Sequence, residues 1–275
     1  METVEPIFVA KLFPEIHREL LILLKSFSDK DWQAETVCSD WTVKDVALHL
    51  LGGVIGNISR RRDGNFAKTS IDDWHDLVNY INTWNQNWVS ASRHISTRLL
   101  IDLLESTGSQ LFDYFRGLDP FSLDGPIGWI GPEPAPVWLD LAREYTEHWH
   151  HQQHIRDAVS LPGLKQPRYF SPVIETFIWA LPRTYSKINS DDNTTVSVNI
   201  TGDSGGCWSI VSRNRIWHLF KGAPEQMATE VIIDQEIAWR IFTRGMNKRL
   251  AQEQMTIHGS QKLGLRLLEM VSIIA

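Results

Sequence analysis

The chain has 275 residues, of which 43% are hydrophobic and 22% charged, and its formal net charge is −6. This length and composition are typical of an ordinary globular protein large enough for two domains. The negative charge argues against a general affinity for nucleic acid or for anionic membranes. No secretory signal and no membrane-spanning run is found, and two distant cysteines predict no disulfide framework. We therefore expect a cytoplasmic protein.

The first two-thirds of the chain show apolar residues at helical spacing. Thr42 precedes Asp45 by three residues, which is the capping-box pattern of a helix start. Pro136 stands at the entrance of a later helix, a position that proline favours. The pattern predicts helices over residues 6–27, 43–62, 71–95, 97–116 and 137–159, with a Gly/Pro-rich loop over 119–136.

The last third changes character and alternates in the manner of strands. Two β-rich runs flank the glycines of 202–206, which predicts a hairpin. We expect strands over 195–200, 207–211, 216–220, 229–233 and 255–258, and helices over 172–181, 234–242 and 262–274. The fold class predicted is α+β, with an up-down four-helix bundle over residues 1–165 and a small α+β domain over 166–275.

A cluster of potential metal ligands lies in the helix predicted over 137–159. Residues 144–154 hold four histidines and two glutamates, and side chains four apart on a helix share a face. Three such pairs occur: Glu144 with His148, Glu147 with His151, and His150 with His154. His49 could add a third ligand from the earlier helix, where its aliphatic neighbours make an unpaired imidazole costly to bury. Three protein ligands and an open position are usual for catalytic zinc.

Two segments also resemble a known family. Trp41-Thr-Val-Lys-Asp-Val-Ala-Leu-His-Leu-Leu-Gly52, after a Thr-x-Cys connector, resembles the first histidine helix of the DinB-like bundle proteins. It is similar, more specifically, to the metal-binding domain of mycothiol-dependent maleylpyruvate isomerase. Residues 142–158 resemble that family's second ligand helix, whose pattern is E-x-x-x-H-x-x-D. The strand-rich tail is similar in type to the sterol-carrier-like domain that often follows this bundle.

The resemblance implies that His49, Glu147 and His151 are the metal ligands. His154 replaces the acidic residue of the family's pattern, and it could form a hydrogen bond or add a further nitrogen. Helical periodicity alone keeps Glu144 and His148 as a fallback pair, because they lie closer to the border of the apolar stripe. Two imidazoles and a carboxylate suit Zn²⁺, and also Ni²⁺, Mn²⁺ or Fe²⁺.

The resemblance further implies an activity. In the resembled family the metal works with a low-molecular-weight thiol, which is added to a small electrophilic substrate or removed from it. Such an enzyme is an isomerase or an S-transferase. Neither Cys38 nor Cys207 is placed as a nucleophile, and we expect Cys38 to pack as a small hydrophobe. An external thiol is consistent with these positions.

Three arginines are weaker candidates for the site. Arg143 could bind a substrate carboxylate, although a salt bridge to Glu144 or Glu147 is favoured. Arg240 and Arg244 lie in the tail, and the resembled enzyme uses a C-terminal arginine near its site.

Two other kinds of function stay open. One is a non-catalytic module that binds a metal or a ligand. The other is a metal-dependent hydrolase in which Glu144 acts as the base. We expect a small-molecule substrate, no nucleic-acid or membrane partner, and a monomer or a homodimer.

Overall fold

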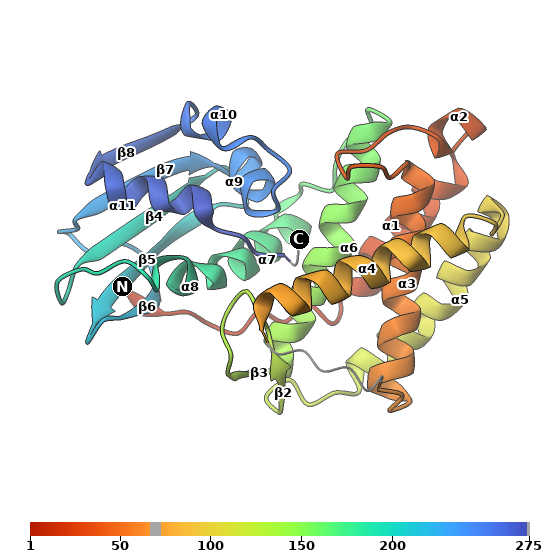
Figure 1. The fold of residues 1–275 in the computed structure, drawn as a ribbon, viewed down its shortest axis with the longest axis horizontal. Coiled ribbons are helices and arrows are strands. Elements are labelled where there is room, and N and C mark those ends of the chain that lie inside the picture. The colour runs from red at the N-terminus through yellow and green to blue at the C-terminus, as the bar shows by residue number, and fades with distance from the viewer. Residues whose placement is uncertain (67–72, 274–275) are drawn as a thin grey trace. The chain divides into compact units, whose positions relative to one another are not determined.

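The computed structural model describes residues 1–66 and 73–273. The chain forms two compact units (Figure 1). The helical unit comprises Phe8–Ser122 and Leu141–Leu164, and the sheet unit comprises Met1–Ile7, Leu123–Asp140 and Lys165–Ala275. The predicted α+β class, with an N-terminal helical region and a C-terminal sheet, is confirmed. The predicted boundary between two domains at residue 165 stays a prediction. Within the described residues, no helix has the length and apolarity that crossing a bilayer requires.

The helical unit follows the predicted helices closely. Its elements are α1 (Phe13–Lys25), α2 (Asp29–Trp32), α3 (Val43–Asn57), a π-helical turn (Ile58–Arg62), α4 (Trp74–Ser92), α5 (Thr97–Arg116) and α6 (Val137–Ala158). The first helix was predicted too long, since α1 begins only at Phe13 with a proline in its first turn. Phe8, expected on its apolar face, is instead 61% exposed. Residues 71 and 72 of the third predicted helix lie outside the described residues.

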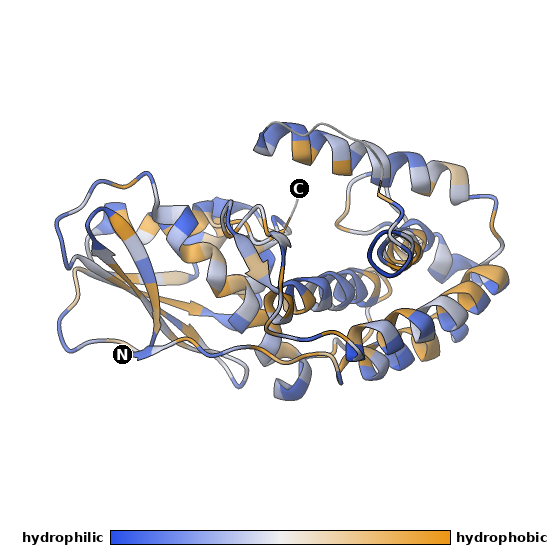
Figure 2. Cartoon of the chain, turned by 90° about the horizontal axis from the view of Figure 1, so that it is seen from below, coloured by the Kyte–Doolittle hydropathy of each residue, from blue (hydrophilic) through white to orange (hydrophobic). Residues whose placement is uncertain are grey.

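The core of the helical unit is built mainly by α1, α3 and α5. Their aliphatic side chains form one cluster, which Ile155 of α6 joins. Figure 2 shows hydrophobic colour on one side of the helices and hydrophilic colour on the other, as expected of amphipathic packing. Helix α4 approaches α3 closely, since the indole nitrogen of Trp88 donates to the carbonyl of Leu48 at 2.8 Å. A side chain at Gly52 would meet that indole at 2.6 Å, so glycine permits the approach.

Helix α6 is buried around most of its circumference. Its buried polar side chains are Glu144, Thr146, His148, His150, His151, Gln152, Gln153 and His154. Two of them bond to neighbouring backbone: Gln152 donates to the carbonyl of Ile16 at 3.0 Å, and the Leu164 amide donates to Gln153 at 3.1 Å. An apolar stripe cannot identify the inward face of a helix that has neighbours on several sides. Both ligand pairs that the sequence left open therefore point inward.

Among the described residues, the main sheet of the sheet unit has six strands: β1 (Glu2–Thr3), β4 (Thr195–Thr201), β5 (Gly206–Arg213), β6 (Ile216–Lys221), β7 (Thr229–Asp234) and β8 (Met255–Gly259). Their order across the sheet is β1-β6-β5-β4-β7-β8, and only β4 and β7 are parallel among these pairs. The predicted hairpin is confirmed as β4 and β5, with Val198 opposite Trp208. Val198 also pairs with Val231 of β7, which places three buried apolar residues side by side at the centre of the sheet.

Short helices accompany the sheet: α7 (Pro167–Phe177), a 3-10 turn (Ile178–Ala180), α8 (Leu181–Tyr185), α9 (Gln235–Phe242), α10 (Lys248–Gln252), α11 (Gln261–Leu265) and a 3-10 turn (Arg266–Glu269). The last helix was predicted too long, since regular helix ends at Leu265, and residue 274 lies outside the described residues. The loop predicted over 119–136 also contains a short strand pair, β2 (Leu123–Pro126) with β3 (Pro134–Pro136). Prolines are uncommon in strands, and this explains why the sequence pattern did not reveal the pair.

Candidate metal centre

Helix α3 begins where the sequence predicts, and its first turn is firmly held. The Thr42 hydroxyl accepts from the Asp45 amide, while the Asp45 carboxylate accepts from the Thr42 amide at 3.1 Å, which completes the capping box. Both carboxylate oxygens of Asp45 also accept from Arg93, at 2.9 and 3.0 Å. These bonds fix the start of the helix and so the direction in which His49 projects, one turn beyond Asp45.

His49 meets the cluster of α6 at one of the predicted pairs. Its ring centroid lies 4.6 Å from that of His151, and the Nε2 atom of His151 lies 3.6 Å from a carboxylate oxygen of Glu147. One ligand atom from each of the three residues lies within 4.8 Å of the others. The structure thus brings together the three residues that the resemblance named.

The donor set fits a metal ion. The Nδ1 atoms of His49 and of His151 are buried and have no hydrogen-bond partner. Leaving a polar atom unpaired in the interior costs about 1–3 kcal/mol, and a ligand that accepts electron pairs from this cluster would offset part of that cost. Two imidazole nitrogens and one carboxylate are donors that Zn²⁺ and neighbouring divalent ions bind well.

The electrostatics of the three groups favour the protonation states that a metal requires. Burial lowers the pKa of His49 to about 4 and that of His151 to about 3, so both rings are neutral at pH 7. Burial opposes ionisation of Glu147, but His150, His151 and Arg143 outweigh it and hold the pKa of this carboxyl far below its usual range. A neutral imidazole and an ionised carboxylate are the forms that bind metal, so few protons compete with the ion.

The fallback pair has other partners. Glu144 accepts from Asn57 at 2.8 Å and from Arg143 at 2.9 Å. His148 packs edge-on against the ring of Phe13, and its Nε2 lies 3.9 Å from Glu144. Among the described residues, Glu144 and His148 fall in no group of three ligands. The salt bridge favoured for Arg143 is therefore confirmed with Glu144.

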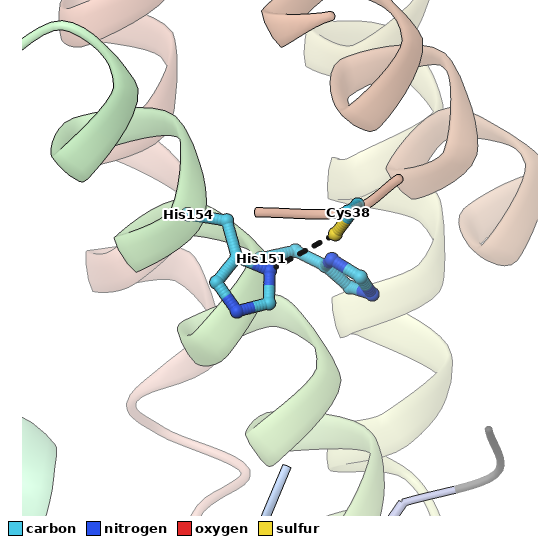
Figure 3. Close-up of side chains that lie close together, drawn as sticks. All are labelled: Cys38, His151 and His154. Atoms are coloured by element: carbon cyan, nitrogen blue, oxygen red, sulfur yellow. Dashed lines mark hydrogen bonds between the residues drawn. The ribbon is translucent and has the colours of Figure 1, made fainter. Parts of the chain in front are cut away.

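His154 lies beside a cysteine that sequence reasoning did not place at the site. The Cys38 sulfur lies 3.3 Å from Nδ1 of His154, and the ring of His151 lies on the other side of the sulfur (Figure 3). Cys38 is half-buried, and burial raises the pKa of its thiol to about 11. As predicted, it packs against the hydrophobic core of the helical unit, and its sulfur also contacts the imidazole of His154. Because the contact joins segments that are distant in sequence, no local sequence pattern could have predicted it.

The connector that carries Cys38 is ordered by Thr36. The Thr36 hydroxyl donates to the carbonyl of Trp41 at 2.9 Å, and the Cys38 amide donates to the same hydroxyl at 3.2 Å. The indole ring of Trp41 in turn lies 5.2 Å from the ring of His49. The Thr-x-Cys segment thereby turns back toward the start of α3 and holds the thiol near the histidines.

The two candidate arginines of the tail lie in the sheet unit. The guanidinium of Arg240 stacks over the indole of Trp239 at 4.3 Å. Arg244 has a positive φ of 58° and lines a cavity of about 320 Å³ with Lys248, Glu269 and several apolar side chains. Arg244 therefore lies beside a space in which a ligand could sit.

Comparisons with known proteins place this geometry in a family. The family profile for the mycothiol maleylpyruvate isomerase N-terminal domain matches residues 13–156, which include His49, Glu147 and His151. The chain belongs to this family. No curated protein matches the chain significantly.

One solved structure agrees at the level of the fold. A crystal structure of the mycothiol-dependent maleylpyruvate isomerase is 12% identical, with a TM-score of 0.50, and covers 86% of this chain and 88% of its own. A histidine-to-alanine mutant of that enzyme is 11% identical, with a TM-score of 0.49 and 90% of each chain covered. At such identity the first of these structures supports the fold alone.

Proposed function

We propose that this protein is a metal-dependent enzyme that uses a low-molecular-weight thiol of the mycothiol type on a small electrophilic substrate. The observation that carries the proposal is the convergence of His49, Glu147 and His151, in a chain of this family, with two buried imidazole nitrogens left for a ligand. The relatives of similar fold are described as mycothiol-dependent isomerases. The reaction proposed is therefore an isomerisation or an S-transfer.

The three residues would hold the ion. Zn²⁺ is the ion that we propose, and Ni²⁺, Mn²⁺ and Fe²⁺ are alternatives because they bind the same kinds of donor atom. When bound, a divalent ion would lower the pKa of a coordinated thiol and supply a nucleophile at neutral pH. The protein's own part is to keep both imidazoles neutral and Glu147 ionised. Asp45 and Arg93 hold the start of α3 and so fix His49 in place.

The nucleophilic thiol is proposed to come from outside the chain. The pKa of Cys38 is raised to about 11 by burial, so its thiol is protonated at pH 7. Burial also raises the pKa of Cys207, which lies on β5 of the sheet unit. We also propose a reducing, cytoplasmic location. Both cysteines are free of disulfides, which is consistent with it.

A hydrolase with Glu144 as base has less support. That carboxylate already accepts hydrogen bonds from Asn57 and Arg143, and both bonds hold it in place. A mobile base aimed at water would need at least one oxygen free of such partners. We therefore keep the thiol-dependent reaction as the single proposed function.

The test is turnover. Purified protein loaded with Zn²⁺ is incubated with mycothiol, or with another bacterial thiol, and a panel of small electrophiles that includes cis-unsaturated keto acids. The proposal expects consumption or isomerisation of at least one electrophile that needs both thiol and metal, and that His49→Ala abolishes. Flat traces over the panel from a metal-loaded protein would favour a non-catalytic module instead.

A further inference from the structure

The contact of Cys38 with the histidines of α6 is a second cluster of metal-ligating atoms beside the first. One ligand atom from each of Cys38, His151 and His154 lies within 4.8 Å of the others. In Figure 3 the rings of His151 and His154 lie close to the sulfur. A hydrogen bond of 3.3 Å joins the sulfur and Nδ1 of His154. Three donors from two segments therefore converge on one point.

The distances suit a tetrahedral ion. Zinc binds sulfur at about 2.3 Å and imidazole nitrogen at about 2.0–2.1 Å, so the two donor atoms of one tetrahedral site stand about 3.6 Å apart. The sulfur and Nδ1 of His154 are within a few tenths of an ångström of that separation. Small rotations of the two side chains would open the space for an ion without moving the helix.

Burial supports the same assignment. His151 and His154 are only 8% and 5% exposed, and the Nδ1 atom of His151 has no hydrogen-bond partner. A hydrogen bond between sulfur and imidazole explains the position of Cys38 against His154, but it leaves Nδ1 of His151 without a partner. A shared ligand explains all three residues together.

We propose that Cys38, His151 and His154 form a second metal site, distinct from the set of His49 and Glu147, that takes a thiophilic ion of the Zn²⁺ class. Binding converts the Cys38 thiol to a thiolate and releases one proton to solvent. Thiolate and imidazole donors favour soft and borderline ions over Mg²⁺ or Mn²⁺. The fourth position is left to water or to an added ligand.

His151 belongs to both ligand sets, and this gives the site a consequence. A neutral imidazole offers one lone pair, so His151 serves one ion at a time. Filling the Cys38 site therefore removes a ligand from the set of His49 and Glu147. An ion bound at the Cys38 site would therefore inhibit the proposed enzyme. This consequence rests on the proposed function, whereas the second site itself does not.

Cobalt(II) alone is the probe, because a thiolate ligand gives Co²⁺ a near-ultraviolet charge-transfer band that nitrogen and oxygen ligands do not give. The full-length metal-free protein is titrated with Co²⁺ and the band is recorded. We expect the band in the parent protein, in His49→Ala and in Cys207→Ser, which removes the other cysteine. Cys38→Ser should lose the band, and His154→Gln should weaken Co²⁺ binding in the band-forming site by about tenfold or more.

The outcomes separate this inference from the proposed function. Co²⁺ bound by the parent protein without the band, or a band that persists in Cys38→Ser, would overturn the second site and leave the first intact. A band in the parent without thiol-dependent turnover would support the second site and count against the proposed function. Far-ultraviolet circular dichroism identifies variants that fail to fold, and Cys38→Ala then replaces Cys38→Ser.

Discussion

The ring of His49 lies against the ring of His151, with 4.6 Å between their centroids, although the two residues belong to helices far apart in the sequence. Glu147 lies one turn before His151, and its oxygen is 3.6 Å from the His151 ring. The contact of α3 with α6 thus brings the three proposed ligands together, and changes at either helix should alter the proposed metal binding.

Replacing Glu147 by Gln should weaken metal binding strongly. The variant keeps the size of the side chain but loses the charge that the ion needs, so we expect an affinity at least about 100-fold lower. Competition with a chromophoric chelator measures it. Glu144→Gln is the matched control one turn away, because Glu144 pairs with Asn57 and Arg143. Equal losses in both variants would contradict the assignment of Glu147.

Asp45→Ala should destabilise the protein, because it removes the α3 cap and leaves Arg93 without its carboxylate. Loss of a cap and of a largely buried charge partner costs about 2–4 kcal/mol. Urea unfolding of the metal-free protein measures the change. Asp31→Ala, which removes the exposed capping box of α2, should have a clearly smaller effect. If the two variants lost equal stability, Asp45 would have no special part in fixing α3.

Gly108→Ala should destabilise the helical unit even though alanine favours helix. A Cβ atom at Gly108 would lie 2.4 Å from Nε2 of His17, which donates to the Leu104 carbonyl at 3.0 Å. Overpacking of this kind costs about 1–3 kcal/mol. Gly53→Ala is the control, because nothing lies within 4 Å of its Cβ, and it should gain up to about 1 kcal/mol. Thermal unfolding of both variants shows whether each substitution lowers or raises the melting temperature.

His17 should make stability depend on pH. Burial, followed by the charge of His148, lowers the pKa of His17 from 6.5 to about 4. The unfolded chain then binds a proton below about pH 6.5 while the native chain does not, so stability is complete above that pH and falls as the pH drops toward 4. The full loss is on the order of 3 kcal/mol.

The check is urea unfolding of metal-free protein at pH 7 and pH 5, for the parent and for His17→Gln. Other buried histidines titrate in both proteins, so the difference between the two isolates His17. The parent should lose more stability than the variant on acidification. Identical losses would show that His17 is not held neutral in the native state.

The sequence predicted those features of the fold that depend on local patterns. The capping box of Thr42 and Asp45 located the start of α3, and the glycines of 202–206 located the hairpin of β4 and β5. The sequence did not predict the pairing of β1 with β6 or of β2 with β3. Two-residue and proline-containing strands show too little alternation of apolar and polar residues.

The candidate site was predictable only in part. Spacing on α6 gave the pairs Glu147/His151 and Glu144/His148, and the family resemblance, rather than periodicity, selected the first. Burial of α6 on nearly all sides is a tertiary property, so no single-helix pattern could have made the choice. The position of Cys38 depends on how a connector turns back on α6, which also lies beyond local pattern.

The most direct test of the account is the metal content of the purified protein. Inductively coupled plasma mass spectrometry is run on the parent, on His49→Ala and His151→Ala, and on His218→Ala as a control at an exposed histidine of β6. We expect near-stoichiometric divalent metal in the parent and the control, and a marked loss in the other two variants. The same metal content in all four proteins would contradict this expectation.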